Sequence, residues 1–175
     1  QAFRNKDNPA FDLKPFIQLV DDEGRLDPAL YDVFEAVKQY DMFLCSVHVN
    51  PYEGMAVMRE AYRCGVRKLV LTHADLPSNP YTIEEQKEVV RMGGLIEHSY
   101  FTSYYERTTW ETLIDQITQV GPENIFLTTD FGQVKSPYSD EGMRMYAEGL
   151  MERGIPYKDI EMMMKIVPAQ MLGVK

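Results

Sequence analysis

Four short apolar segments, separated by stretches with helical periodicity, constrain the fold of this chain more than any other feature. Nearly continuous apolar runs of this length are typical of strands that are covered on both faces. Strands that alternate with helices indicate βαβ units, so the sequence predicts an α/β fold with a parallel sheet. The four segments are MFLCSVHV (42–49), KLVLTH (68–73), LIEHS (95–99) and NIFLTTD (124–130).

Start and stop signals place helices between these strands. Asp27 and Asn50 each stand directly before a proline, a combination that is typical of the first turn of a helix. Thr82 and Glu85 have the spacing of a capping box. The segment FTSYYERTT (101–109) is expected to be a polar and aromatic loop. Three further helices are expected at about 110–120, 140–152 and 157–166.

Length and charge limit the number of domains and the kinds of partner. The 175 residues, of which 45% are hydrophobic, are enough for one sizeable core, so a single domain over 1–175 is expected. The net charge of -9 and the lack of a basic run argue against a nucleic-acid partner. No apolar run reaches about 18 residues and no signal-peptide pattern is present, so no membrane partner is predicted. The two cysteines resemble small buried hydrophobes, and a cytoplasmic location is expected.

All three histidines of the chain fall at the carboxyl ends of predicted strands. His48, His73 and His98 end the first three apolar segments, and Asp130 ends the fourth. Because the carboxyl ends of parallel strands open on the same face, these four side chains are expected to meet at one site. A single histidine beside an apolar strand often makes only one structural hydrogen bond, and this alternative stays open for each of them. Imidazole and carboxylate are good ligands for Zn²⁺ and similar ions, so the pattern predicts metal-assisted hydrolysis.

Other polar residues near the strand ends are weaker candidates. Gln133, Tyr104 and Arg107 lie in the connections after the third and fourth strands and are predicted to contact a substrate. Asp75 is either a partner of the site or a turn residue. Glu97 is expected to point to the side of its strand opposite to His98, toward the helix layer, where it would form a structural ion pair.

The order of these motifs resembles the C-terminal half of the amidohydrolase superfamily, and the resemblance runs from about residue 17 to the end. The motifs are SVHVNP, KLVLTHAD, a strand with IEHS, IFLTTDFGQ and the tail VPAQMLG. The resemblance implies a (β/α)8 barrel with one or two divalent metals at its mouth. This chain would be a partial (β/α)8 TIM barrel that holds the four βα units of strands five to eight. More narrowly, THAD, EEQKEVVRMGGLIEHS, GPENIFLTTDFGQ and PAQMLG are similar to an uncharacterised family of amidohydrolase-like proteins.

The resemblance also implies a role for each residue at the strand ends. His48 and His73 match metal ligands of the superfamily. Asp130 matches an aspartate that binds metal and takes a proton from the attacking water. His98 would orient the substrate. The superfamily's His-x-His pair on strand one and its ligand on strand four have no counterpart, because no histidine precedes His48.

The missing half of the barrel leads to an expectation about partners. Either the N-terminal half is supplied by another part of the protein or another chain, or two half-barrels pair as a homo-oligomer to cover their open sheet edges. The chain on its own is expected to bind metal weakly.

The sequence as a whole therefore predicts a metal-dependent hydrolase. Its substrate is expected to be a small molecule with a C–N or C–O bond, such as an amide, lactone or ester. Zinc is the expected metal, with manganese, iron or nickel as alternatives. Three other functions stay open: a metal-dependent decarboxylase on the same site, a non-catalytic half-barrel that acts by association, and an α/β domain whose histidines bind an anion directly.

Overall fold

The computed structural model describes residues 18–78 and 80–174, and within them four strands form one parallel sheet in the order β1-β2-β3-β4. This arrangement confirms the expected α/β class with a parallel sheet. Each strand begins inside one of the four apolar segments, but most are shorter than the segments themselves. The strands are β1 (Leu44–Cys45), β2 (Leu69–Leu71), β3 (Leu95–Ser99) and β4 (Ile125–Thr128).

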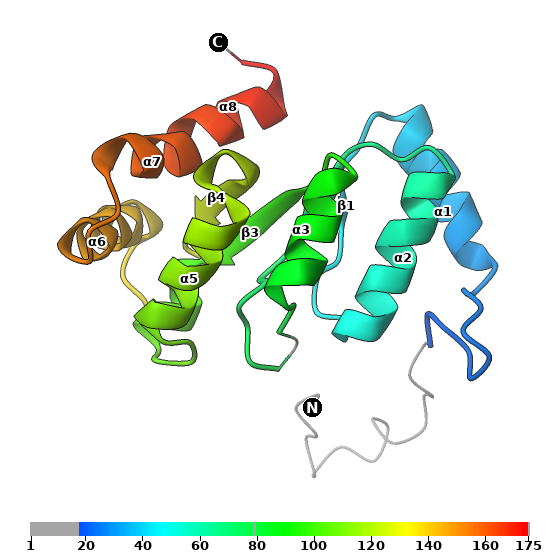
Figure 1. Ribbon diagram of the computed structural model, residues 1–175, viewed down its shortest axis with the longest axis horizontal. Coiled ribbons are helices and arrows are strands. Elements are labelled where there is room, and N and C mark those ends of the chain that lie inside the picture. Colours follow the sequence, from blue (N-terminus) through cyan, green and yellow to red (C-terminus); the bar gives the residue numbers. More distant parts are fainter. Residues whose placement is uncertain (1–17, 79, 175) are drawn as a thin grey trace.

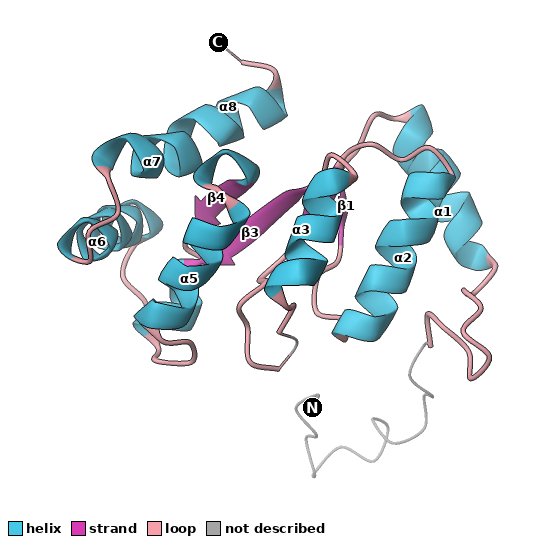
Figure 2. Cartoon of the chain, in the orientation of Figure 1, coloured by secondary structure: helices cyan, strands magenta, loops and turns pink. Residues whose placement is uncertain are grey.

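Helices connect the strands and follow the last one. Figure 1 shows α2, α3 and α5 side by side on one face of the sheet, while α6, α7 and α8 gather beyond β4; Figure 2 shows how little of the chain is strand. The helices are α1 (Ala29–Gln39), α2 (Pro51–Arg63), α3 (Ile83–Arg91), α4 (Tyr100–Tyr104), α5 (Trp110–Val120), η2 (Pro122–Asn124), α6 (Ser139–Glu152), α7 (Tyr157–Glu161), η3 (Met162–Ile166) and α8 (Val167–Leu172).

Side-chain caps fix the helix starts that the sequence indicates. The Asn50 side chain accepts a hydrogen bond of 3.0 Å from the backbone N–H of Glu53 at the start of α2. The capping box of α3 is complete, since Thr82 accepts from the N–H of Glu85 and Glu85 accepts from the N–H of Thr82. These bonds satisfy backbone donors that the first helical turn leaves free.

The strand register divides the sheet into two different faces. Leu71 pairs with Ile96, and Ile96 pairs with Ile125, and all three side chains are fully buried in the core beneath the helices. Glu97 pairs with Phe126 one step further along, so both side chains belong to the opposite face. We call this opposite face the open face, because Cys45 on it is exposed and Phe126 is only partly buried.

Two sequence expectations about elements are wrong. The segment 101–109 is not a loop throughout, since Tyr100–Tyr104 forms the short helix α4. The last helix does not stop at 166, because a π-helical turn over Met162–Ile166 leads into α8, which begins with Pro168 in its first turn. Across the described residues, none of the helices combines the length and apolar character needed to traverse a bilayer.

Candidate functional site

Two histidines from neighbouring parallel strands meet at the carboxyl edge of the sheet. His73 lies in the turn that follows β2 and is 8% exposed, whereas His48 lies in the turn after β1 and is exposed. Their ring centroids are 5.1 Å apart, with an angle of 32° between the ring planes. The structure therefore brings together the two residues that the sequence predicts as metal ligands from the fifth and sixth barrel strands.

The backbone at this edge is strained. Val47, His73 and Asp130 have φ angles of 50°, 52° and 52°, in the left-handed region, and they follow β1, β2 and β4 respectively. A non-glycine residue in a sparsely populated backbone region costs about 1–3 kcal/mol, and a β-branched residue such as Val47 is rare there. Such strain clusters at ligand-binding and catalytic sites. Among the described non-glycine residues with a positive φ, these three lie at the edge that the histidine pair occupies, whereas Asp41 and Glu106 lie elsewhere.

Glu97 reaches the histidine pair from the open face of β3. Its Oε2 atom lies 3.4 Å from Nδ1 of His73 and accepts a hydrogen bond of 3.3 Å from the backbone N–H of the same residue. Its Oε1 atom accepts a hydrogen bond of 2.7 Å from Thr128 Oγ1 at the end of β4. The expectation that Glu97 faces the helix layer is wrong, because the register places it on the open face beside Phe126.

His98 lies on the opposite face, inside the core. Its side chain is 0% exposed, and Nδ1 lies 3.3 Å from Oδ1 of Asp75, which is equally buried. Thr102 Oγ1 donates a 2.5 Å hydrogen bond to the other carboxylate oxygen. The expected substrate contact of His98 does not fit this burial, so the structure places the residue in a polar pair within the core. Leu95 and Ile96, which precede Glu97 and His98 in β3, are both apolar and do not indicate which of the two polar residues faces the open side.

Burial and hydrogen bonding act in opposite directions on Asp75. Burial by itself raises the pKa of its carboxyl group, but the hydrogen bond and charge of His98 and the hydrogen bond from Thr102 outweigh it, so the pKa lies below the ordinary value of 3.8. Asp75 is therefore a buried carboxylate that holds His98, and it is not the partner of His73 that the sequence left open.

Asp130 is exposed and follows β4 by two residues. Within residues 18–78 and 80–174, no group of three or more His, Cys, Asp or Glu side chains is arranged to hold a metal ion. Asp130 thus does not complete a three-residue set with His48 and His73 among the described residues.

The predicted substrate contacts lie in α4, in the loop that follows it and in the loop after β4, and the last loop touches α4 through Phe131. Gln133 is exposed, and its side chain donates a 2.9 Å hydrogen bond to the carbonyl of Asp130. Tyr104 packs its ring edge against Phe131, with centroids 5.1 Å apart. Arg107 is exposed and lies 4.9 Å above the ring of Phe101. Each of these contacts is made within the protein, so each of the three predicted substrate-binding residues already has a structural role.

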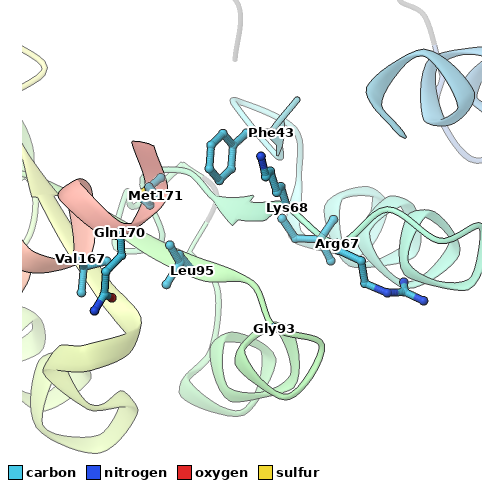
Figure 3. A pocket seen from close by; sticks show the side chains of 9 residues that line it. Phe43, Arg67, Lys68, Gly93, Leu95, Val167, Gln170 and Met171 are labelled. Carbon is cyan, nitrogen blue, oxygen red and sulfur yellow. The ribbon is translucent and has the colours of Figure 1, made fainter. Parts of the chain in front are cut away.

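The described residues line hollows at both the amino ends of the strands and the open face of the sheet. One hollow of about 250 Å³ lies at the amino ends of the strands, at the end of the sheet opposite to His48 and His73 (Figure 3). The residues that line it include Lys68, Leu69, Gly93, Leu95, Val167 and Met171. A second hollow of about 340 Å³ follows the open face and includes Val47, Thr72 and Glu97, which are neighbours or partners of the two histidines. The second hollow is the one that adjoins the candidate site.

A family model described as a family of unknown function, DUF6282, matches residues 1–97. The chain belongs to the DUF6282 family. The match includes His48, His73 and Glu97, and it ends before His98 and Asp130. The DUF6282 match therefore covers the three side chains that the structure brings together at the carboxyl edge. Comparison with curated proteins gives no match, and comparison with solved structures gives none either.

Proposed function

We propose that this chain carries part of the active site of a metal-dependent hydrolase on a partial (β/α)8 barrel. The observation that carries the proposal is the pair formed by His48 and His73, whose ring centroids are 5.1 Å apart at the carboxyl ends of adjacent parallel strands. Active sites of parallel α/β folds assemble at this end of the sheet.

The spacing of the two rings fits a shared metal ion. Imidazole nitrogens bind zinc at roughly 2.0–2.1 Å, and a tetrahedral arrangement then places two ring centres about 5 Å apart. The separation of 5.1 Å agrees with this geometry. Because catalytic zinc sites use about three protein ligands, the pair supplies only part of a full set. The remaining donors would come from outside the residues that the structure describes.

The partial barrel is supported by the topology. Four parallel strands follow one another in sequence order, and helices cover one face of their sheet. In a closed (β/α)8 barrel the other face is the barrel interior. The open face, with Phe126 and Glu97, would then face four further strands.

Each residue of the site has a distinct part in this proposal. His48 and His73 would hold a divalent ion such as Zn²⁺, which supplies Lewis-acid polarisation and a nucleophile made from water near neutral pH. Asp130, exposed at the end of β4, would accept a proton from the attacking water. A small molecule with a C–N or C–O bond, such as an amide, lactone or ester, is the proposed substrate.

A metal titration of the purified chain tests this function. We expect Co²⁺ to bind with an absorption spectrum that indicates nitrogen ligands, and Zn²⁺ to displace it. His48→Ala and His73→Ala should each weaken binding at least about tenfold, which corresponds to about 1.4 kcal/mol. Glu106→Gln, which neutralises an exposed carboxylate in the loop after α4, should leave the affinity unchanged.

A screen of amides, lactones and esters with the metal-loaded chain then reads out the reaction. Turnover that is lost in both histidine variants but kept in Glu106→Gln would support the proposal. Metal binding that is equally strong in the wild type and in a variant lacking both His48 and His73 would refute it.

A further inference from the structure

We propose that Glu97 is the positioning residue of this site, which sets the tautomer of His73 and so leaves Nε2 as its metal-binding nitrogen. This inference rests on the proposed function for its purpose, but its geometry and its first test do not depend on a bound metal.

Glu97 is buried and connects three strand ends. It is 9% exposed, and from β3 its carboxylate reaches His73 after β2 on one side and Thr128 at the end of β4 on the other. It accepts from the backbone N–H of His73 as well as facing the ring of that residue. One side chain thus holds the backbone of a predicted metal ligand and places a carboxylate oxygen beside its ring.

The chemistry of the two atoms that face each other determines the effect. An ionised carboxylate only accepts hydrogen bonds, so it favours the proton of a neutral imidazole on the nitrogen nearest to it. Oε2 lies 3.4 Å from Nδ1 but outside hydrogen-bond geometry, so in the described part of the chain this nitrogen is buried without a hydrogen-bond partner and has the carboxylate beside it. The Nδ1–H tautomer follows, and it leaves the lone pair on Nε2. Metal-binding histidines commonly donate their other ring N–H to a carboxylate in this way.

The other two histidines do not share this arrangement. His98 also has a carboxylate beside Nδ1, but its side chain is 0% exposed and its Nε2 is enclosed without a hydrogen-bond partner among residues 18–78 and 80–174. His48 is exposed. Among the three histidines, His73 is therefore the one that both has a buried carboxylate beside its ring and lies at the carboxyl ends of the strands.

Nitrogen-15 NMR of histidine-labelled, metal-free protein tests the inference, at a pH where the rings are neutral. We expect His73 to be in the Nδ1–H form in the wild type and to lose this preference in Glu97→Gln. The Zn²⁺ affinity of Glu97→Gln should fall by about 10–100-fold, as is usual when such a partner is removed. An Nε2–H form of His73 in the wild type would overturn the inference.

Thr128→Val is the matched control, because it removes the other hydrogen bond of Glu97 and leaves the carboxylate beside His73. It should keep the Nδ1–H form. If Glu97→Gln lowers only the melting temperature, and leaves both the tautomer and the Zn²⁺ affinity unchanged, then Glu97 is merely structural and the inference fails. If the wild type shows the Nδ1–H form but binds no metal, the proposed hydrolase function fails while the role of Glu97 stands.

Discussion

The buried pair of His98 and Asp75 joins several elements near the carboxyl ends of the strands. Both side chains are 0% exposed, and Asp75 also accepts from Thr102. Its backbone carbonyl accepts a 2.6 Å hydrogen bond from Thr108 Oγ1. The loop after β2 is thereby joined to α4 and to the start of the segment before α5, so Asp75 connects elements far apart in the sequence.

We expect Asp75→Asn to lower the free energy of unfolding by about 3–5 kcal/mol. The substitution removes the carboxylate of Asp75 and leaves His98 buried without this partner. The pKa of Asp75 in the folded chain lies below 3.8. Its stabilisation is therefore complete above the pKa of the unfolded chain and is lost as the pH falls through the lower folded value. Urea unfolding at several pH values should show the difference between wild type and variant shrinking in acid.

Asp130→Asn provides the control for this measurement, because Asp130 is exposed. Its free energy of unfolding should stay within about 0.5 kcal/mol of the wild type. Equal destabilisation by the two substitutions would contradict the assigned role of Asp75.

The residues of the site were only partly predictable. His48 and His73 come together because both follow parallel strands, and the spacing of the apolar segments is sufficient to indicate this. The sequence does not predict to which face of the sheet each side chain of β3 points. Leu95 and Ile96 are both apolar, so apolar and polar residues do not alternate there. Only the pairing of Glu97 with Phe126 shows which of the two polar residues faces His73.

At the level of helices and strands, local signals predicted most helix starts, both with a side-chain cap, as in α2 and α3, and without one, as in α6 and α7, but they missed α4. α2 and α3 have capping side chains, and both begin where the sequence predicts. α4 has no such cap, and it depends on tertiary contacts such as the stacking of Tyr100 on Tyr146, with ring centroids 4.7 Å apart. The helix expected at 157–166 instead continues through a π-helical turn into α8, and Pro168 is tolerated there because it lies in the first turn, where no N–H is needed.

The packing of α2 gives a prediction for this helix. A Cβ atom on Gly54 would lie 2.0 Å from Oη of Tyr81, whose side chain is 1% exposed and cannot move aside freely. Gly54→Ala should therefore destabilise the chain by about 1–3 kcal/mol, although alanine is the better helix former. Thermal unfolding checks this, with Gly132→Ala as the control, because no atom of the described residues lies within 4 Å of its added Cβ. A Gly54→Ala variant that is more stable than the wild type would show that the contact with Tyr81 relaxes.

For the molecule as a whole, the outer edge of β1 is the least protected part of the sheet. In the part of the chain that the structure describes, β1 pairs only with β2. Met42 is 53% exposed and Val47 is 49% exposed at this edge. Unpaired edges with apolar side chains favour association with another strand.

We expect the chain to associate in a concentration-dependent manner and Met42→Lys to weaken this association about tenfold, because a charge at a strand edge opposes pairing. Sedimentation velocity over a range of concentrations measures the effect. Met151→Lys changes a residue of similar exposure, 44%, on α6 and should have no effect. A monomer at every concentration of the wild type would contradict the prediction.

The left-handed backbone at Val47, His73 and Asp130 lowers the thermal stability of the chain at the edge where the proposed site lies. Glycine adopts this conformation without a steric penalty, and asparagine tolerates it better than most residues. Variants of this protein that are selected only for thermal stability would therefore be expected to acquire glycine or asparagine at these positions. Directed evolution for stability would have to keep His73 and Asp130 unchanged, since replacing them would relieve backbone strain and remove a residue of the proposed site, whereas Val47 could be exchanged.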